Sequence, residues 1–482
     1  MIIKNVDALA SHGNVDGRKV VLDILDAGLK ASDPYENTRR LVRVQGGKLI
    51  VGEKGFARRA VVDTPPDSMP LIFDLSKVGS IYVVGGGKAA QRMAHGIEDA
   101  LGDSITEGQV NAKKGEPLLC KRIHVTFAGH PLPDEDSVAG ARRIVEIMQK
   151  AKKGDIVFYV LSGGASALTT LPAPGLTLKD VQDVIRMLYF ERGASMPETN
   201  AVRGMLVMLG QDRHPRYPGD ATMIEFLTEE IPREIPYERI HARRASSTET
   251  SAPPYRRAVE VLKRYELWDK VPQPVRTHLE RADPRYDLVT PEELRGKARY
   301  FIRVIGPEYM LEGAQKRAEE LGVNANVLIK SLNDIEAQPV GELMSCIALS
   351  LETYCRPFEP PCAVLFGGET TVAVGNATGR GGRNQEFALS TALRIAGSKS
   401  IVVASVDSDG TDGPTDAAGG IVDGYTMERA REAGINVIGE LKNHNSNEVL
   451  AKLGDAIYTG ARSTNVRGLS IVYVGKSSQL QE

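Results

Sequence analysis

Short apolar runs that end in glycine, each followed by a stretch with helical spacing, dominate the first half of the chain. Residues 81–87 (IYVVGGG) form such a run, and the next residues place Met93, Ile97 and Leu101 on one helical face. The runs at residues 123–129 and 155–164 repeat this order. Continuous β-branched runs that alternate with helices are typical of a parallel sheet covered on both faces. The sequence therefore predicts a Rossmann-like, doubly wound α/β first domain.

Three local patterns predict further elements around this alternation. Residues 20–31 predict a helix with one apolar face, formed by Val21, Leu22, Leu25 and Leu29. Residues 40–52 predict a hairpin, because two short apolar runs flank a Gly-Gly pair. Thr177 and Asp180 form a capping-box pattern, which predicts a helix that starts directly after Thr177.

The alternation breaks down once and then resumes. Residues 212–295 are rich in Pro, Arg and Glu, and we interpret them as a connecting segment with one helical stretch at residues 256–267. Strand and helix patterns then return and continue to the end of the chain, at residues 300–306, 363–368, 383–397, 401–407 and 469–475. We therefore expect two domains, residues 1–290 with the connecting segment and residues 291–482 as a second α/β domain.

Composition narrows the classes of partner and compartment. The 482 residues include 60 Lys and Arg against 62 Asp and Glu. The net charge therefore creates no electrostatic field that would attract a nucleic acid or an anionic membrane as partner. No apolar run is long enough to span a membrane or to form a signal core. The four cysteines form no CxxC pair and are expected to be reduced. These features predict a cytoplasmic protein.

Four predicted strands end in glycine clusters with polar neighbours, at residues 85–88, 162–167, 367–370 and 407–413. In open parallel sheets, ligands bind at the carboxyl ends of strands, where glycine lets the backbone approach an anion. One cluster alone fits a tight turn without a ligand, whereas four together favour an anionic ligand with several groups. The candidate nucleotide- and phosphate-binding residues are Gly85, Gly86, Gly87, Ser162, Gly163, Gly164, Ser166, Gly367, Gly368, Glu369 and Thr370.

Two cations stand beside these clusters. Lys88 lies at the start of a predicted helix, where the helix dipole disfavours a cation unless a phosphate or carboxylate binds there. Arg383 and Asn384 open another predicted helix after the glycines of GRGG. A guanidinium group at such a position suits bidentate recognition of phosphate or carboxylate. Lys88, Arg383 and Asn384 are therefore candidate substrate-binding residues, although arginines on a solvated loop are also common.

Acidic residues follow the predicted strand at residues 401–407. Asp407, Asp409 and Asp412 are interleaved with glycines, and the spacing does not fit an EF-hand, because Asp412 stands where that loop needs its glycine. A chain of Asx turns explains the pattern without function. Carboxylates at the carboxyl end of a strand also suit Mg²⁺ or a general base. Asp409 ranks first for both roles, and Asp412 is a second candidate for the metal.

Standard nucleotide motifs are absent or incomplete. Residues 85–90 satisfy G-x-G-x-x-A, but no acidic residue ends a convincing next strand about 20 positions on, as dinucleotide binding expects. No P-loop motif occurs, and residues 162–167 do not form a nucleophile elbow because the second glycine is missing. A dinucleotide-dependent oxidoreductase stays open on this pattern.

Several segments together resemble the glycerate 2-kinase family, whose C-terminal part is the MOFRL domain. These segments are VVGGGKAA, FAGHPLPDEDS, LSGGASAL, LFGGETTV, GRGGRNQE, DSDGTDGPTDAAGGIVDG and the late TNV. The resemblance implies a Rossmann-like first domain, a second α/β domain, an active site in the cleft between them, and dependence on ATP and Mg²⁺. It places the catalytic lysine, arginine and aspartate of the family on Lys88, Arg383 and Asp409. The chain departs from the family pattern at residues 200–212 and 241–254.

These observations together predict an ATP-dependent kinase for a small hydroxy acid, with D-glycerate converted to 2-phosphoglycerate as the leading hypothesis. The partners expected are the acid and the nucleotide, and a homodimer stays open. Two alternatives remain at this point. The first is an NAD(P)H-dependent hydroxypyruvate reductase, and the second is a non-catalytic protein that binds a sugar acid or a nucleotide.

Overall fold

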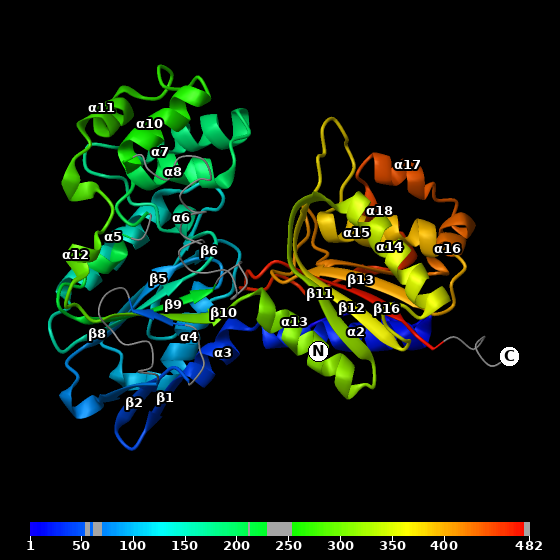
Figure 1. The fold of residues 1–482 in the computed structure, drawn as a ribbon. Coiled ribbons are helices and arrows are strands. Elements are labelled where there is room, and N and C mark those ends of the chain that lie inside the picture. The colour runs from blue at the N-terminus through cyan, green and yellow to red at the C-terminus, as the bar shows by residue number, and fades with distance from the viewer. Residues whose placement is uncertain (54–57, 61–69, 211–212, 229–252, 477–482) are drawn as a thin grey trace. The chain divides into compact units, whose positions relative to one another are not determined.

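The computed structural model of the protein describes residues 1–53, 58–60, 70–210, 213–228 and 253–476 (Figure 1). The chain divides into two compact units. Of the described residues, those within 34–228 and 253–304 form the middle unit, and those within 1–33 and 305–476 form the terminal unit. Each unit has its own sheet. None of the helices in these described ranges is both long and apolar enough to cross a membrane.

A seven-stranded sheet forms the centre of the middle unit, in the order β3-β10-β9-β8-β5-β6-β7. The strands are β3 (Arg58–Ala60), β5 (Ile81–Gly86), β6 (Glu107–Lys113), β7 (His124–Ala128), β8 (Ile156–Leu161), β9 (Thr222–Thr228) and β10 (Arg299–Ile305). Strand β5 pairs in parallel with both β6 and β8. From β5 the chain continues outward through β6 and β7, and from β8 it continues outward the other way through β9 and β10. The topological switch point therefore lies between β5 and β8, and the doubly wound first domain is confirmed.

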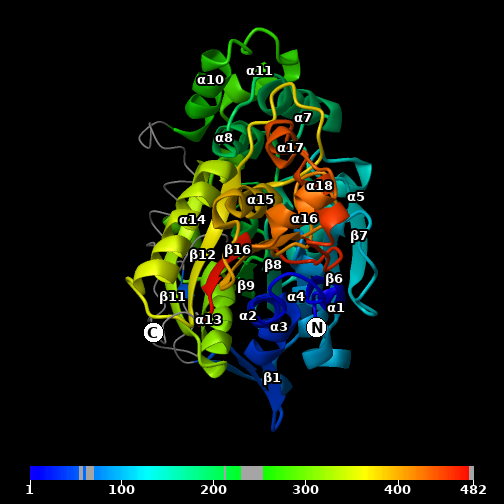
Figure 2. The same ribbon diagram turned by 90° about the vertical axis from the view of Figure 1, so that its right-hand side faces the viewer.

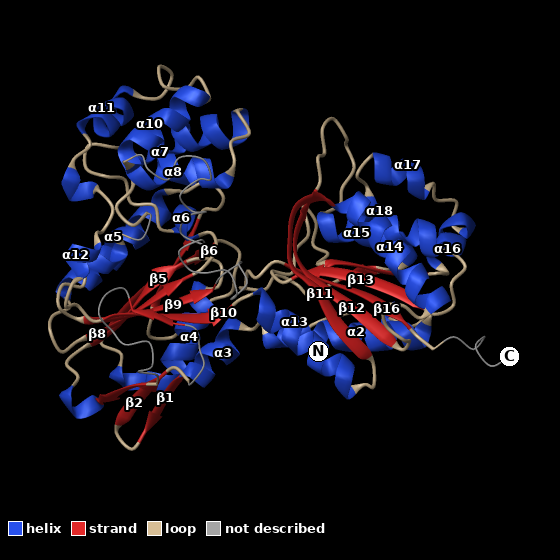
Figure 3. Ribbon diagram, viewed as in Figure 1, coloured by secondary structure: helices blue, strands red, loops and turns tan. Residues whose placement is uncertain are grey.

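Helices cover both faces of this sheet. Figure 3 shows α5 and α6 on one face and α3 and α4 on the other. The bounds are α3 (Pro34–Leu41), α4 (Ala90–Leu101), α5 (Glu135–Lys150) and α6 (Ala165–Leu168). The middle unit also contains short 3₁₀ turns, at Leu75–Lys77, Gly102–Ser104, His214–Arg216 and Pro284–Tyr286. The predicted hairpin is present as β1 (Val42–Gln45) and β2 (Lys48–Val51), which form a small antiparallel sheet with β4 (Leu71–Asp74).

A helical cluster completes the middle unit (Figure 2). It contains α7 (Leu178–Ile185), α8 (Met196–Leu206), α10 (Pro254–Arg264) and α11 (Gln273–Arg281), with a π-helical turn at Arg186–Glu191. The short α12 (Pro291–Leu294) lies outside this cluster, on the side of α5 (Figure 1). Thr177 caps α7 in the predicted capping box. The cluster has its own apolar core, which includes Val184, Val202, Val261 and Leu279.

The terminal unit holds a six-stranded mixed sheet in the order β11-β12-β16-β13-β14-β15. Its strands are β11 (Asn324–Glu336), β12 (Cys362–Thr371), β13 (Ile401–Asp407), β14 (Gly419–Asp423), β15 (Ala456–Ile457) and β16 (Gly468–Val474). Strands β11 and β12 are parallel, whereas β16 runs antiparallel to both β12 and β13. Strands β11, β12 and β13 consequently end at the same edge of the sheet, where β16 begins.

Two helical layers cover this second sheet (Figures 1 and 3). One layer contains α2 (Val15–Ala31) and α13 (Pro307–Glu320). The other contains α14 (Ala337–Tyr354), α15 (Arg383–Ile395), α16 (Thr426–Glu432), α17 (Val437–Lys442) and α18 (Ser446–Leu453). Helix α2 follows the short α1 (Val6–Leu9) and is attached by Arg18, whose fully buried guanidinium binds Asp423 at 2.5 Å and Asp455 at 2.8 Å.

The division into units differs from the expected boundary at residue 290. Residues 1–33 pack with the C-terminal half of the chain, because the buried Arg18 finds its carboxylate partners there. Strand β10, expected in the second domain, belongs to the first sheet. The expected connecting segment also contains β9, which pairs with β8 and is therefore part of the core sheet. Residues 241–252, where the chain departs from the family pattern, lie outside the described residues.

Candidate functional site

The middle unit carries a candidate half-site at the switch point, where the glycine clusters of β5 and β8 meet. The backbone N–H of Lys88 donates to the carbonyl of Gly163 at 2.9 Å. The N–H of Ala89 donates to Ser162 Oγ at 2.9 Å, and the N–H of Ser162 lies 3.4 Å from the carbonyl of Gly86. Ligands of doubly wound sheets bind outside the carboxyl ends of the strands at this position. The fold therefore brings the first two predicted clusters together at a general ligand-binding position.

Packing between the two strands explains why glycines are needed there. A Cβ atom on Gly85 would lie 2.0 Å from the carbonyl oxygen of Val160. A Cβ on Gly87, whose φ is +133°, would lie 2.2 Å from Ser162 Oγ. Similarly, a Cβ on Gly86 would meet the methyl group of Thr169 at 2.3 Å. These three glycines are required by the joint between β5 and β8, whether or not they also contact a ligand.

Lys88 has a neighbour that the sequence analysis did not single out. The ring of His130 and the side-chain stem of Lys88 flank Gly164, since a Cβ on this glycine would lie 3.2 Å from His130 Nε2 and 3.4 Å from Lys88 Cγ. Both side chains are partly exposed. His130 belongs to the FAGHPLPDEDS segment directly after β7, and its position after a strand end was the available signal. The middle unit thus combines a cation and an imidazole at the switch point.

The terminal unit carries a second half-site around Arg383, the first residue of α15. Its guanidinium donates to Asp407 at the end of β13 and lies 3.2 Å from Glu369 on β12. Burial alone lowers the pKa of Arg383, but the carboxylates of Asp407 and Glu369 outweigh it and raise the pKa, so the group stays protonated. Its Nε is buried and has no hydrogen-bond partner among the described residues.

Asp407 is an unusual carboxyl group because it is almost completely buried. Burial raises its pKa to about 7, with a further contribution from Asp409, while Arg383 acts in the opposite direction. Asp407 was not among the site residues predicted from the sequence. A buried carboxyl group with a strongly shifted pKa beside a cation is a common feature of functional sites.

Asp412 has a structural position that does not fit the expected metal ligand. Its oxygens accept hydrogen bonds from the backbone N–H groups of Asn384 at 3.2 Å and Gln385 at 2.9 Å, and from both side-chain amides. A Cβ on Gly382 would lie 2.3 Å from Asp412 Cγ, so this glycine makes the approach of the carboxylate feasible. Burial raises the pKa of Asp412, and hydrogen bonds from Gln385 oppose the shift. The carboxylate is fully buried and caps α15, which argues against the predicted role of Asp412 as a metal ligand.

Asp409 lies in the turn after β13 and is partly exposed. Its Oδ1 accepts from the N–H and the hydroxyl of Thr411, both at 3.0 Å, and its own N–H donates to Asp407. In the part of the chain that the structure describes, no three His, Cys, Asp or Glu side chains are grouped to hold a metal ion. A metal in this half-site would therefore need ligands from a bound molecule in addition to Asp409.

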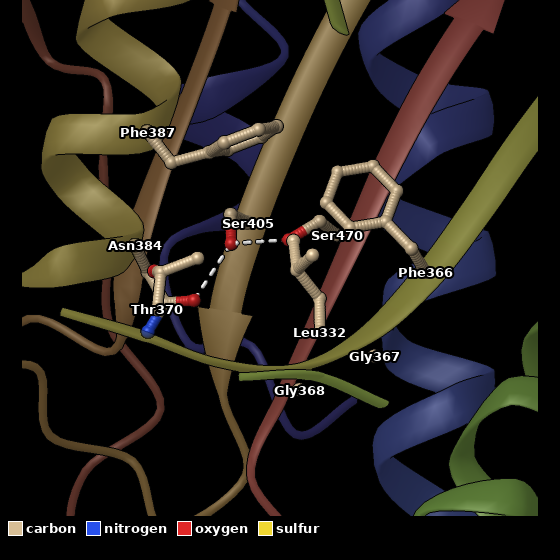
Figure 4. A pocket seen from close by; sticks show the side chains of 9 residues that line it. All are labelled: Leu332, Phe366, Gly367, Gly368, Thr370, Asn384, Phe387, Ser405 and Ser470. Carbon is tan, nitrogen blue, oxygen red and sulfur yellow. Dashed lines mark hydrogen bonds between the residues drawn. The ribbon is translucent and has the colours of Figure 1, made fainter. Parts of the chain in front are cut away.

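Asn384, a predicted substrate-binding residue, forms hydrogen bonds within the protein. Its Oδ1 accepts from Ser405 Oγ at 2.7 Å, and Ser405 Oγ lies 2.7 Å from Ser470 Oγ (Figure 4). Its Nδ2 donates to Asp412, so both ends of the amide are occupied. The three side chains line a pocket with a volume of only about 10 Å³, enough for about one water molecule. Gly367, Gly368 and Thr370 line the same pocket, which is too small for a nucleotide.

The two half-sites define a class of protein. Both lie at the carboxyl ends of strands in α/β units, and both offer cations beside glycine-rich turns. These features define a two-unit α/β protein in which each unit has a cation and glycine-rich turns at the carboxyl ends of its strands, a position where such folds bind ligands.

Comparisons with known proteins identify the family. Residues 20–280 match the model of a domain of unknown function, DUF4147, and residues 362–468 match the MOFRL family. The glycerate 2-kinase of Pyrococcus horikoshii is 35% identical over 461 residues, which cover 95% of this chain and 98% of that protein. The crystal structure of glycerate kinase from Thermotoga maritima matches with a TM-score of 0.75 at 29% identity, covering 95% of this chain and 99% of that one. The chain therefore belongs to the glycerate 2-kinase family.

A further relative carries a different name. A protein from Agrobacterium vitis with the provisional name hydroxypyruvate reductase is 30% identical over 465 residues, covering 96% of this chain and 95% of that protein.

Proposed function

We propose that this protein is a glycerate 2-kinase that transfers the γ-phosphoryl group of ATP to the 2-hydroxyl group of D-glycerate. The observation that carries the proposal is the nearly full-length relationship to glycerate 2-kinases, which includes both units. Phosphoryl transfer depends mainly on positioning and on neutralising charge. The cations and the carboxyl groups of the two half-sites suit these tasks.

Each half-site has its own part in the proposed reaction. In the middle unit, Lys88 and the turn from Ser162 to Ser166 bind phosphate oxygens. In the terminal unit, Arg383 binds the transferred group or the carboxylate of the acid, and Asp409 accepts the proton of the attacking hydroxyl group. The bond between the γ-phosphorus and the bridging oxygen of ADP breaks as the hydroxyl oxygen forms its new bond to phosphorus. The proton moves from this hydroxyl group to the Asp409 carboxylate.

Mg²⁺ fits this proposal as a companion of the nucleotide. Mg²⁺ keeps several waters and is usually held by one or two carboxylates together with substrate phosphates. Asp409 is a partly exposed carboxylate that suits this role, whereas Asp412 is engaged in capping α15. When bound, the ion would neutralise charge on the phosphates.

An ATP-consumption screen tests the proposal. Purified protein is given ATP, Mg²⁺ and one acid at a time, with D-glycerate, erythronate and gluconate as the panel, and ³¹P and ¹H NMR locate the new phosphate. We expect turnover with D-glycerate and phosphorylation at the 2-position. Lys88→Ala should lower kcat about 100- to 1,000-fold, as loss of a charge-stabilising group does. The control Lys179→Ala removes an exposed lysine that pairs with Asp183 on α7 and should leave kcat unchanged. Absence of ATP consumption with every acid would refute the proposal.

A reductase is the second candidate, because of the Agrobacterium vitis relative and the G-x-G-x-x-A pattern. The structure supplies the strand that this motif requires, since β6 follows α4 directly, but β6 ends at Lys113 and carries no acidic residue at its end. Dinucleotide binding uses such an acidic residue to bind the ribose. Oxidation of NADH with hydroxypyruvate in the absence of ATP would favour this candidate over the kinase.

A further inference from the structure

Glu369 lies between two arginines in the terminal unit. Its Oε1 is 3.2 Å from Arg383 Nη2, and its Oε2 is 3.5 Å from Arg467 Nε. The Glu369 side chain is 42% exposed, whereas the side chains of Arg383 and Arg467 are 25% and 17% exposed. The two guanidinium groups therefore converge on one carboxylate that is open to solvent.

Arg467 is held in this position from several sides. It precedes β16, and its φ of +69° lies in the left-handed region, which is uncommon for an arginine and requires support from the surrounding structure. Its carbonyl accepts the N–H of Ser408 at 3.0 Å, and its Nη1 donates to Asn333 Oδ1 on β11. The guanidinium is consequently fixed at the edge where β11, β12 and β13 end.

The Glu369 carboxylate, which lies between the two arginines, is weakly held. An ion pair with a half-exposed carboxylate is worth little, because water and salt screen it. A phosphate group offers more charge and three oxygens, and it forms bidentate contacts with guanidinium groups. Bound phosphate would therefore displace the Glu369 carboxylate from the two arginines at small cost.

We propose that Arg467 and Arg383 form a two-arginine seat for a phosphate group, and that Glu369 occupies this seat when no phosphate is bound. The inference rests on the proposed function in one respect, because it assigns the phosphate to the reaction. The ligand that fits this seat is a phosphate monoester or the terminal phosphate of a nucleotide. Arg467 becomes a further substrate-binding residue, and Glu369 changes from a predicted phosphate ligand to an internal competitor of phosphate.

Binding of inorganic phosphate without metal tests the seat independently of turnover. Isothermal titration calorimetry is performed on the full chain and on three variants. Arg467→Ala should weaken phosphate binding about 10- to 100-fold, because a hydrogen bond to a charged group is lost. Arg467→Lys should restore part of the affinity. Glu369→Gln should tighten binding several-fold, because the competing carboxylate is removed.

The opposite response of the Glu369 variant excludes general damage to the fold, since a structural defect would not improve binding. Arg394→Ala is the matched control, because Arg394 on α15 forms an exposed pair with Glu342. It should bind phosphate as the unchanged protein does. Unchanged affinity in Arg467→Ala, or weaker binding in Glu369→Gln, would overturn the proposal.

The source of the phosphate is found by repeating the titrations with ADP and with 2-phosphoglycerate. Loss of affinity for 2-phosphoglycerate in Arg467→Ala would assign the seat to the phosphorylated acid, and loss for ADP would assign it to the nucleotide. Loss for neither ligand would overturn its role in the reaction. If the protein binds phosphate as expected but phosphorylates no acid, the seat stands and the proposed function fails.

Discussion

Asp412 accepts the backbone N–H of Gln385 at 2.9 Å, so a buried carboxylate occupies the N-terminus of α15. The first residue of this helix is Arg383, which the same arrangement therefore holds at the sheet edge. An anion at this position satisfies N–H groups that have no partner within the helix and interacts favourably with the helix dipole. The acidic cluster after β13 thus contains one residue that supports the half-site from within the fold.

Replacing Asp412 should change stability more than it changes metal dependence. Asp412→Ala removes a helix cap and takes the acceptor from the backbone N–H groups of Asn384 and Gln385 and from the Asn384 side-chain amide, which should cost about 2 to 4 kcal/mol. Asp412→Asn keeps part of the hydrogen bonding and should cost less. Urea unfolding measures both variants, and Asp416→Ala, which alters an exposed neighbour, serves as the control. A changed Mg²⁺ requirement with unchanged stability would contradict the capping role.

Asp134 predicts a pH dependence of stability in the middle unit. Burial alone raises its pKa, but hydrogen bonds from Lys114, Gly129 and Ser137 outweigh this and lower the pKa to about 2. A carboxyl group with a lowered pKa stabilises the fold above its unfolded pKa of about 4. This contribution is lost as the pH falls through about 2. The partly exposed position of the Asp134 side chain reduces the effect to about 1 to 2 kcal/mol.

The comparison with Asp134→Asn isolates this contribution, because asparagine also caps helices but does not titrate. Urea unfolding between pH 7 and pH 3 should show a constant difference in the free energy of unfolding down to pH 5 and a smaller difference at pH 3. Asp136→Asn is the control, since Asp136 also lies near Lys114 but is 54% exposed. A difference that grows as the pH falls would reverse the sign and refute the assignment.

The strands that the sequence predicts are those with uninterrupted apolar runs, such as β5 and β8. Strand β6 was missed, because Gln109 and Asn111 interrupt its apolar pattern although both are fully buried. Gln109 Nε2 donates to Asn111 Oδ1 at 3.0 Å, and Asn111 Nδ2 donates to the carbonyl of Leu168 at 2.7 Å. The contact with Leu168 is distant in sequence, so local periodicity does not reveal that these buried polar groups are satisfied.

Helix α2 shows a second limit of local patterns. Its apolar face was predicted and is buried, but the sheet that covers this face was not. The deciding contact is Arg18 with Asp423 and Asp455, which lie more than 400 residues away in the chain. Periodicity identifies a buried face and does not identify the partner of that face.

The candidate site was predictable where cations and glycines are neighbours in sequence, as with Lys88 and Arg383. Their catalytic roles stay predictions. Arg467 and His130 could not be found in this way, because no glycine cluster marks them and their contacts with Glu369 and Gly164 arise only in the fold.

Gly87 offers a final test of the joint between β5 and β8. Gly87→Ala places a methyl group 2.2 Å from Ser162 Oγ at a φ of +133°, so the variant suffers both a clash and backbone strain.

Gly154→Ala is the matched control, because its φ of +95° gives strain while nothing lies within 4 Å of the added methyl group. Strain alone should cost about 1 to 2 kcal/mol in the control. Gly87→Ala should cost more, because the clash adds an overpacking penalty of about 1 to 3 kcal/mol. It should also lower kcat, because Lys88 follows directly. Urea unfolding and the ATP-consumption assay measure the two effects, and equal losses in both variants would show that the joint tolerates the methyl group.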